Sequence, residues 1–201
     1  MNRDEQKYTD HAIGEGATLR FWPKAFDHTQ AEVDKVDALC EAKERIKFKL
    51  YGKPCVQHRK QVMFHKDYKF SGITVKAHDG ETPVLVSKAQ QFCKEQFPDM
   101  DSNAVLAIKY GPKDYISPHR DNEGKHEKGK PIVGFNFGET RTLTIKSYKR
   151  KRADEGYVRQ FFLLPAGSAY AMLGDRFQTN FTHEVGRGEA TRVSLTVRHF
   201  V

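Results

Sequence analysis

The second half of the chain is dominated by short runs of β-branched and aromatic residues, separated by turns that contain glycine or proline. Such runs are typical of β-strands, and many short strands in succession favour a sandwich or a barrel. The runs lie at 105–110, 132–137, 140–147, 159–164 and 192–200. This pattern constrains the fold more than any other, because it predicts a mainly β core over about 103–201.

Two amphipathic helices are expected ahead of this β region. The sequence Thr29-Gln-Ala-Glu32 has the pattern of a capping box, and apolar residues recur at helical spacing over 30–46. A second apolar stripe covers 84–97 and is followed by Pro98, which favours the end of a helix. The helices are therefore additions to a β fold.

Length and cysteine content narrow the class of protein. A chain of 201 residues with 38% hydrophobic content fits one domain, 1–201, better than two. No apolar stretch approaches the roughly 18 residues of a membrane span, and the polar segment 1–10, expected to be loose, has no apolar signal core. The cysteines Cys40, Cys55 and Cys93 are odd in number and widely spaced, which argues against a disulfide framework. We expect an intracellular monomer without membrane contact.

The charge of the chain suggests a polyanionic partner. There are 34 Lys and Arg against 26 Asp and Glu, a formal net charge of +8, and the basic residues cluster at 53–69, 125–130 and 146–152. Such stripes attract nucleic-acid backbones through Coulomb attraction and counterion release. A solvated surface gives the same pattern, and 149–152 is also typical of a nuclear localisation signal. The expected location is nuclear in a eukaryotic cell and cytoplasmic otherwise.

A candidate metal site combines a local pair with a distant residue. His119 and Asp121 are two residues apart, so in an extended segment their side chains point to the same face. With His183 as a third ligand they would form the facial triad of two histidines and one carboxylate that binds Fe(II) and leaves positions open. In a chain with nine histidines, a surface or hydrogen-bonded histidine is the alternative.

The run 192–198 supplies a second indication. Its polar face would carry Arg192, Ser194, Thr196 and Arg198, and its apolar face Val193, Leu195 and Val197. Two arginines directed into a barrel need anions, and a guanidinium can bind a carboxylate with two parallel hydrogen bonds. The two Cα atoms would be roughly 20 Å apart, close to the reach of two arginines with a short dicarboxylate between them. A solvated polar face is the alternative when this strand is taken alone.

These residues resemble the AlkB family of Fe(II)- and 2-oxoglutarate-dependent dioxygenases, in particular its branch that repairs 1-methyladenine and 3-methylcytosine in duplex DNA. The segment 114–123, Asp-Tyr-Ile-Ser-Pro-His-Arg-Asp-Asn-Glu, is similar to that branch's metal motif, and Arg192-x-Ser-x-Thr-x-Arg198 is similar to its Arg-x-Asn-x-Thr-x-Arg signature. The resemblance implies His119, Asp121 and His183 as metal ligands. It implies Tyr110, Arg192, Ser194 and Arg198 as contacts of 2-oxoglutarate.

Residues 47–75 resemble the family's nucleotide-recognition lid. The similar blocks are Tyr51-Gly-Lys53, Arg59-Lys60-Gln61 and Tyr68-Lys-Phe70-Ser-Gly72. By this resemblance Tyr51 fills the gap left by a flipped base, Tyr68 and Phe70 wall the base pocket, and Glu123 lies near the flipped base. Arg59, Lys60 and Gln61 would also contact substrate. Aromatic residues interleaved with basic ones suit base stacking with phosphate contact, although the rings could also be ordinary core residues.

The resemblance implies a double-stranded β-helix, a jelly-roll barrel, with N-terminal helices and a lid. The implied activity is oxidative demethylation of N-alkylated bases in DNA with Fe(II), O2 and 2-oxoglutarate. Ile108 and Ser194 stand where the family usually has asparagine, so a hydrogen bond near the co-substrate is lost. Alternatives are the same chemistry on RNA, on an undamaged base or on a protein side chain. A metal-free nucleic-acid-binding module is the alternative of another class.

Overall fold

A computed structural model describes residues 7–50, 52–70, 72–121 and 126–201. These residues form a mainly β fold with few helices, in which a seven-stranded and a four-stranded antiparallel sheet are the main elements. The larger sheet has the order β1 (Thr9–Gly14), β2 (Ala17–Trp22), β13 (Ala169–Leu173), β10 (Ile132–Gly138), β15 (Arg192–Arg198), β8 (Ala104–Tyr110) and β5 (Lys60–Phe64). The smaller sheet has the order β12 (Arg159–Leu164), β11 (Arg141–Ser147), β14 (Phe181–Val185) and β9 (Ile116–His119).

The two sheets pack face to face through a shared apolar layer. Ile132 and Met172 of the larger sheet belong to the same buried cluster as Leu143, Ile145 and other residues of the smaller one. This arrangement is consistent with the double-stranded β-helix expected from the sequence. It leaves an interior space between the sheets in which side chains from both can meet.

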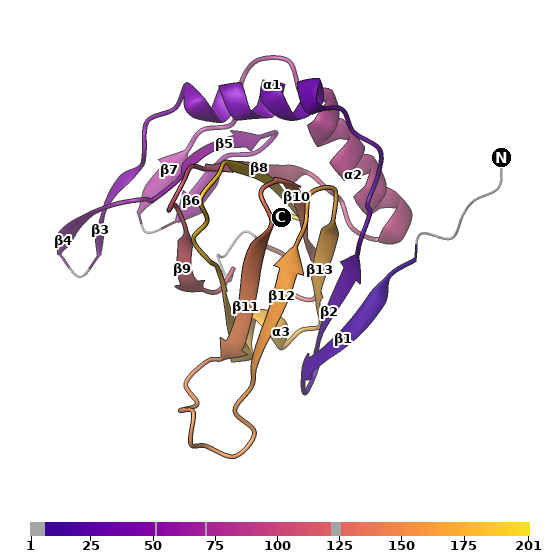
Figure 1. Ribbon diagram of the computed structural model, residues 1–201, viewed down its shortest axis with the longest axis vertical. Helices are drawn as coiled ribbons and strands as arrows, with labels where there is room; N and C mark the ends of the chain where they lie inside the picture. Colours follow the sequence, from indigo (N-terminus) through magenta and orange to yellow (C-terminus); the bar gives the residue numbers. More distant parts are fainter. Residues whose placement is uncertain (1–6, 51, 71, 122–125) are drawn as a thin grey trace.

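Helices cover the other face of the larger sheet. In Figure 1, α1 (Gln30–Glu41) and α2 (Val84–Gln96) lie across the sheet, and they share a buried cluster with its strands. The capping box at Thr29 is present, with its backbone N–H donating to the Glu32 carboxylate at 2.9 Å. The first helix is shorter than the expected 30–46, because the chain turns after Glu41 to enter the strand β3 (Lys47–Leu50). The second agrees with the expected 84–97 to within one residue.

The described part of the chain is regular almost from its first residue. Residues 1–10 were expected to be loose; residues 1–6 lie outside the described part, but β1 begins at Thr9 and pairs with β2 along the edge of the larger sheet. The hairpin turn uses Gly16 at a φ of +67°, a conformation that favours glycine. Cross-strand pairing with β13 extends the sheet as far as this hairpin.

Segment 47–75 contributes an edge strand to the larger sheet and two small hairpins. It contains the hairpin β3 (Lys47–Leu50) with β4 (Lys53–Val56), strand β5, and the hairpin β6 (Tyr68–Phe70) with β7 (Ile73–Val75). Figure 1 shows β3 and β4 extending away from the sheets. The third helix, α3 (Phe177–Asn180), is a single turn before β14. Among the described residues, no helix is long and apolar enough to cross a membrane.

Strand β15 holds the central position that matters for the site. It lies between β10 and β8, and alternation directs its side chains as the sequence predicted. Val193, Leu195 and Val197 pack in the cluster under the helices. The opposite face, with Arg192, Ser194, Thr196 and Arg198, lines a cavity between the sheets.

Candidate metal and co-substrate site

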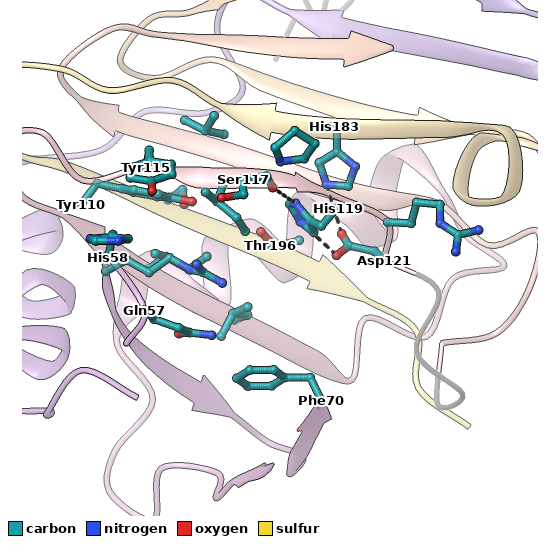
Figure 2. A pocket seen from close by; sticks show the side chains of 18 of the residues that line it. Gln57, His58, Phe70, Tyr110, Tyr115, Ser117, His119, Asp121, His183 and Thr196 are labelled. Carbon is teal, nitrogen blue, oxygen red and sulfur yellow. Dashed lines mark hydrogen bonds and ion pairs between the residues drawn. The ribbon is translucent and has the colours of Figure 1, made fainter. Parts of the chain in front are cut away.

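The three predicted metal ligands meet at one place inside the barrel. His119 at the end of β9 pairs directly with His183 of β14, and Asp121 follows two residues after His119. One ligand atom from each residue lies within 4.8 Å of the others. The Asp121 carboxylate is 3.5 Å from His119 Nε2 and 3.6 Å from His183 Nε2. Figure 2 shows the three side chains turned toward one another.

Neighbouring groups orient two of these ligands. His119 Nδ1 is 2.9 Å from the Ser117 carbonyl oxygen, which can only accept a hydrogen bond. Nδ1 therefore carries the proton, and the lone pair of Nε2 is free for a metal ion. The backbone N–H of Asp121 donates to the side-chain oxygen of Gln178 in α3, at 2.8 Å. Gln178 thus holds the chain in position where Asp121 leaves β9.

The charge state of the cluster suits a divalent cation. Burial alone would raise the pKa of Asp121, but the Arg198 guanidinium 3.1 Å away, together with the two neighbouring histidines, holds that pKa well below its ordinary value. Burial, followed by the charge of His119, lowers the pKa of His183. Two imidazole nitrogens with an ionised carboxylate are the donor set of the Fe(II) facial triad, so these residues fit that metal.

Arg192 is a buried cation without a matching anion. Its residue is only 1% exposed, and no carboxylate within the described part of the chain pairs with it. Nη2 donates to the Asn136 side-chain oxygen, while Nε and Nη1 have no hydrogen-bond partner among the described residues. The guanidinium carbon lies 5.1 Å from the Tyr110 ring centroid, and burial lowers the arginine pKa. Two unused donors in a buried place fit a carboxylate.

One cavity of about 520 Å³ joins the metal cluster to Arg192. Thr196 and Ser194 of β15 lie between the positions of Arg198 and Arg192, so the cavity follows this strand from the metal ligands to the buried guanidinium. The cavity is also lined by Tyr110, Ile108 and several residues from the segment 47–75. Its two ends therefore offer a metal site and an anion site, as a chelating dicarboxylate requires.

The residues that the sequence placed in a lid are only partly brought to this cavity. Arg59, Tyr68 and Phe70 line it, and the Tyr68 and Phe70 ring centroids are 5.2 Å apart. Lys60 and Gln61 do not line it, because Lys60 pairs with Glu41 of α1 and the Gln61 side chain is buried along β5. The expected substrate contacts Tyr51 and Glu123 lie outside the described residues.

Several lining residues carried no recognisable signal in the sequence. His58 and Tyr115 stack with centroids 4.9 Å apart at the cavity wall, and the Arg187 guanidinium lies 4.3 Å from the Tyr115 centroid. Tyr170 of β13 also lines the cavity, whereas Asn136 of β10 does not line it and reaches the site only through its hydrogen bond from Arg192. The other residues of these two strands are mostly apolar. An isolated polar residue in an apolar strand was the available signal for Asn136. Such residues are recognised only when cross-strand pairing is known.

Comparisons with known proteins agree with this site. A model of the 2OG-Fe(II) oxygenase superfamily matches residues 20–198. A search of curated proteins finds no significant sequence match. The solved structure of OsALKBH1 is similar, with a TM-score of 0.58 at 15% sequence identity, covering 95% of this chain and 100% of that chain. At this low identity the likeness concerns the fold alone.

Proposed function

Because the chain belongs to the 2OG-Fe(II) oxygenase superfamily, we propose that it is an AlkB-like dioxygenase that removes methyl groups from N-alkylated bases in DNA. The proposed lesions are of the 1-methyladenine and 3-methylcytosine type. One observation carries this proposal: a single cavity connects the histidine–aspartate cluster, the buried Arg192 and a wall of aromatic side chains. A metal, a diacid and a planar base could all reach the same space.

The metal end and the diacid end have separate residues. Fe(II) and 2-oxoglutarate are the cofactors that the family and the ligand cluster imply, with His119, Asp121 and His183 to hold the metal. When bound, the metal supplies oxidation of a C–H bond by O2, coupled to conversion of 2-oxoglutarate to succinate and CO2. Arg192 would bind the distal carboxylate of the co-substrate. Arg198 keeps the Asp121 carboxylate ionised and so maintains the ligand set.

The wall opposite the smaller sheet suits a planar substrate. Tyr68 and Phe70 from β6 line the cavity, and Phe48 and Val56 reach it from the β3–β4 hairpin. Aromatic faces bind extruded bases by stacking, with little dependence on base identity. These contacts support segment 47–75 as a nucleotide-recognition lid. The roles of Tyr51 and Glu123 in that lid rest on the sequence resemblance.

Basic residues of the loop between β11 and β12 suit a phosphate backbone. The exposed run 149–152 lies on the loop between β11 and β12, which Figure 1 shows extending from the barrel. At the base of this loop, Tyr148 stacks against Arg120, with the guanidinium carbon 3.9 Å from the ring centroid. Arg120 lines the cavity between two metal ligands. The loop therefore begins beside the site, and its charge would attract a strand that enters it.

The decisive experiment measures succinate formation with Fe(II), O2 and 2-oxoglutarate, using matched methylated and unmethylated oligonucleotides. We expect stimulation by 1-methyladenine or 3-methylcytosine in DNA, and none by the unmethylated strands. Stimulation only by RNA would move the substrate to RNA. Stimulation by no oligonucleotide, with succinate still formed, would favour a protein or another substrate. No succinate under any condition would favour a binding module without catalysis.

Two variants test whether this activity depends on the metal ligands. His183→Ala should abolish succinate formation because a metal ligand is lost. His28→Ala removes a histidine outside the cavity and should leave the activity unchanged.

The basic surface is tested by the salt dependence of DNA binding. The affinity for duplex DNA should weaken as salt is added, with a log–log slope of about −0.9 per phosphate neutralised. Affinity that does not depend on salt would contradict a backbone contact.

A further inference from the structure

The ring of Tyr170, in β13, lies over a glycine of the neighbouring strand β10. Tyr170 pairs directly across from Gly134 of β10. A Cβ atom placed on Gly134 would lie 2.6 Å from Tyr170 Cε1 and 2.7 Å from its hydroxyl oxygen, and real Cβ atoms do not approach other atoms so closely. The phenol ring therefore lies over bare backbone. The sequence at 134 and the position of this ring are linked.

The ring extends across the sheet toward the middle of the cavity. On its other side, Gly134 pairs with Thr196 of β15, which lies between Arg192 and Arg198 in the strand. Tyr170 lines the same cavity as these residues, and its residue is 7% exposed. Its phenol thus lies on the floor between the metal end and the Arg192 end.

The electrostatic surroundings keep this phenol in its protonated form. Burial raises the pKa of Tyr170, and the nearby Arg192 guanidinium lowers it by less than burial raises it. Tyr110 and Asp121 also affect it, which places the phenol within electrostatic range of both ends of the cavity. A protonated hydroxyl can donate one hydrogen bond to an anion.

Tyr170 is the residue of β13 that offers a neutral donor to this part of the cavity. The other hydroxyl groups nearby, those of Tyr110, Ser194 and Thr196, come from β8 and β15, while Ile108 has no polar side-chain atom. A diacid that extends from the metal ligands to Arg192 has to cross the space over Gly134. The group that limits this space from the β13 side is the Tyr170 ring.

We propose that Tyr170 positions the 2-oxo diacid co-substrate and determines the length of diacid that the site accepts. The hydroxyl donates a hydrogen bond to the co-substrate, and the ring, held over Gly134, closes the cavity to longer acids. This role rests on the co-substrate site described under the proposed function. It assigns to a residue of β13 a task that the sequence had given only to residues of β8 and β15.

Calorimetric titration of the Mn(II)-loaded protein tests the role without any need for turnover. The probes are 2-oxoglutarate and 2-oxoadipate, which is one methylene longer. Tyr170→Phe keeps the ring and loses the donor, so 2-oxoglutarate should bind about tenfold more weakly, while 2-oxoadipate stays excluded. Tyr170→Leu also removes the ring, so the affinity ratio of 2-oxoadipate to 2-oxoglutarate should rise at least about tenfold.

Gly134 provides an independent way to move the same ring. Gly134→Ala should displace the phenol and weaken 2-oxoglutarate binding by at least as much as Tyr170→Phe. In a Tyr170→Leu background the added methyl has no ring to collide with, so the second change should have little further effect. Tyr157→Phe removes a hydroxyl outside the cavity and serves as the matched control. Thermal unfolding of each variant shows whether it is folded.

The outcomes separate this role from the co-substrate site itself. If Tyr170→Phe binds 2-oxoglutarate like the wild type, the hydrogen bond is refuted. If Tyr170→Leu still excludes 2-oxoadipate, or the Gly134 and Tyr170 effects simply add, the length limit is refuted. Should Tyr170→Leu fail to fold, Tyr170→Phe and Gly134→Ala decide. Wild-type protein that binds neither acid would overturn the site proposed around Arg192, and the role of Tyr170 with it.

Discussion

Replacement of Arg192 by methionine should make the metal-free protein more stable. The guanidinium is buried, and its Nε and Nη1 have no partner among the described residues. Each unsatisfied buried donor costs about 1–3 kcal/mol. Methionine removes both donors, which increases stability. It also leaves the Asn136 side-chain oxygen without its donor, which costs about 1–3 kcal/mol of stability. Water in the cavity reduces both values, so we expect a net gain of about 1–2 kcal/mol in the free energy of unfolding.

Bound co-substrate should reverse this order. A ligand at one hundred times its Kd stabilises the native state by about 2.7 kcal/mol. The wild type should gain this amount from 2-oxoglutarate with Mn(II), whereas Arg192→Met should gain almost nothing from the diacid. Urea unfolding with and without both ligands measures the two effects. The variant would then be the more stable protein without ligands and the less stable one with them.

Arg141 is a matched control because it is similarly buried, but each of its three guanidinium nitrogens donates a hydrogen bond. Its guanidinium donates to Glu139 and to the carbonyl oxygens of Gly111, Asp114 and Ala190. Arg141→Met should therefore lose about 3–5 kcal/mol of stability without ligand. If Arg192→Met is also less stable than the wild type without ligand, the claim that the buried Arg192 guanidinium lacks partners for two of its nitrogens is wrong. If it still responds to 2-oxoglutarate like the wild type, it does not bind the diacid.

Further predictions concern the capping box, the metal ligands and the thiols. Thr29→Ala should lower the free energy of unfolding by about 1 kcal/mol in urea, since it removes the helix cap, and an unchanged midpoint would contradict this. Asp121→Ala should eliminate Mn(II) binding in a calorimetric titration, and retained wild-type affinity would exclude Asp121 as a ligand. Burial raises the pKa of Cys40 from 9.0 to about 12 and also raises that of Cys93, so at pH 8 a thiol reagent should modify only half-buried Cys55 in native protein. Because the unfolded thiols lose protons near pH 9 while the folded Cys40 thiol keeps its own, stability should fall from pH 9 toward pH 12, and Cys40→Ala should reduce that fall.

The strand pattern and the ligand spacing were predictable because they are local. The two-residue period in 192–198 decides which side chains share a face, whatever the partners of the strand are. The spacing of His119 and Asp121 has the same property, and a helix cap needs only the three residues after Thr29. In these cases neighbours along the chain carry the information. The β1–β2 hairpin at the start was missed because its pairing with β13 stabilises it from outside.

The sequence by itself determined the mainly β character, the two covering helices, the candidate ligand set and the polar face of β15. Only the tertiary structure decided which side chains complete the site. Gln178 and Asn136 act through single hydrogen bonds to Asp121 and Arg192, from positions 57 and 56 residues away in the chain. Tyr170 reaches the cavity because its cross-strand partner is a glycine. Sheet register brings such pairs together, and register depends on the packing of the whole barrel rather than on residues near either partner.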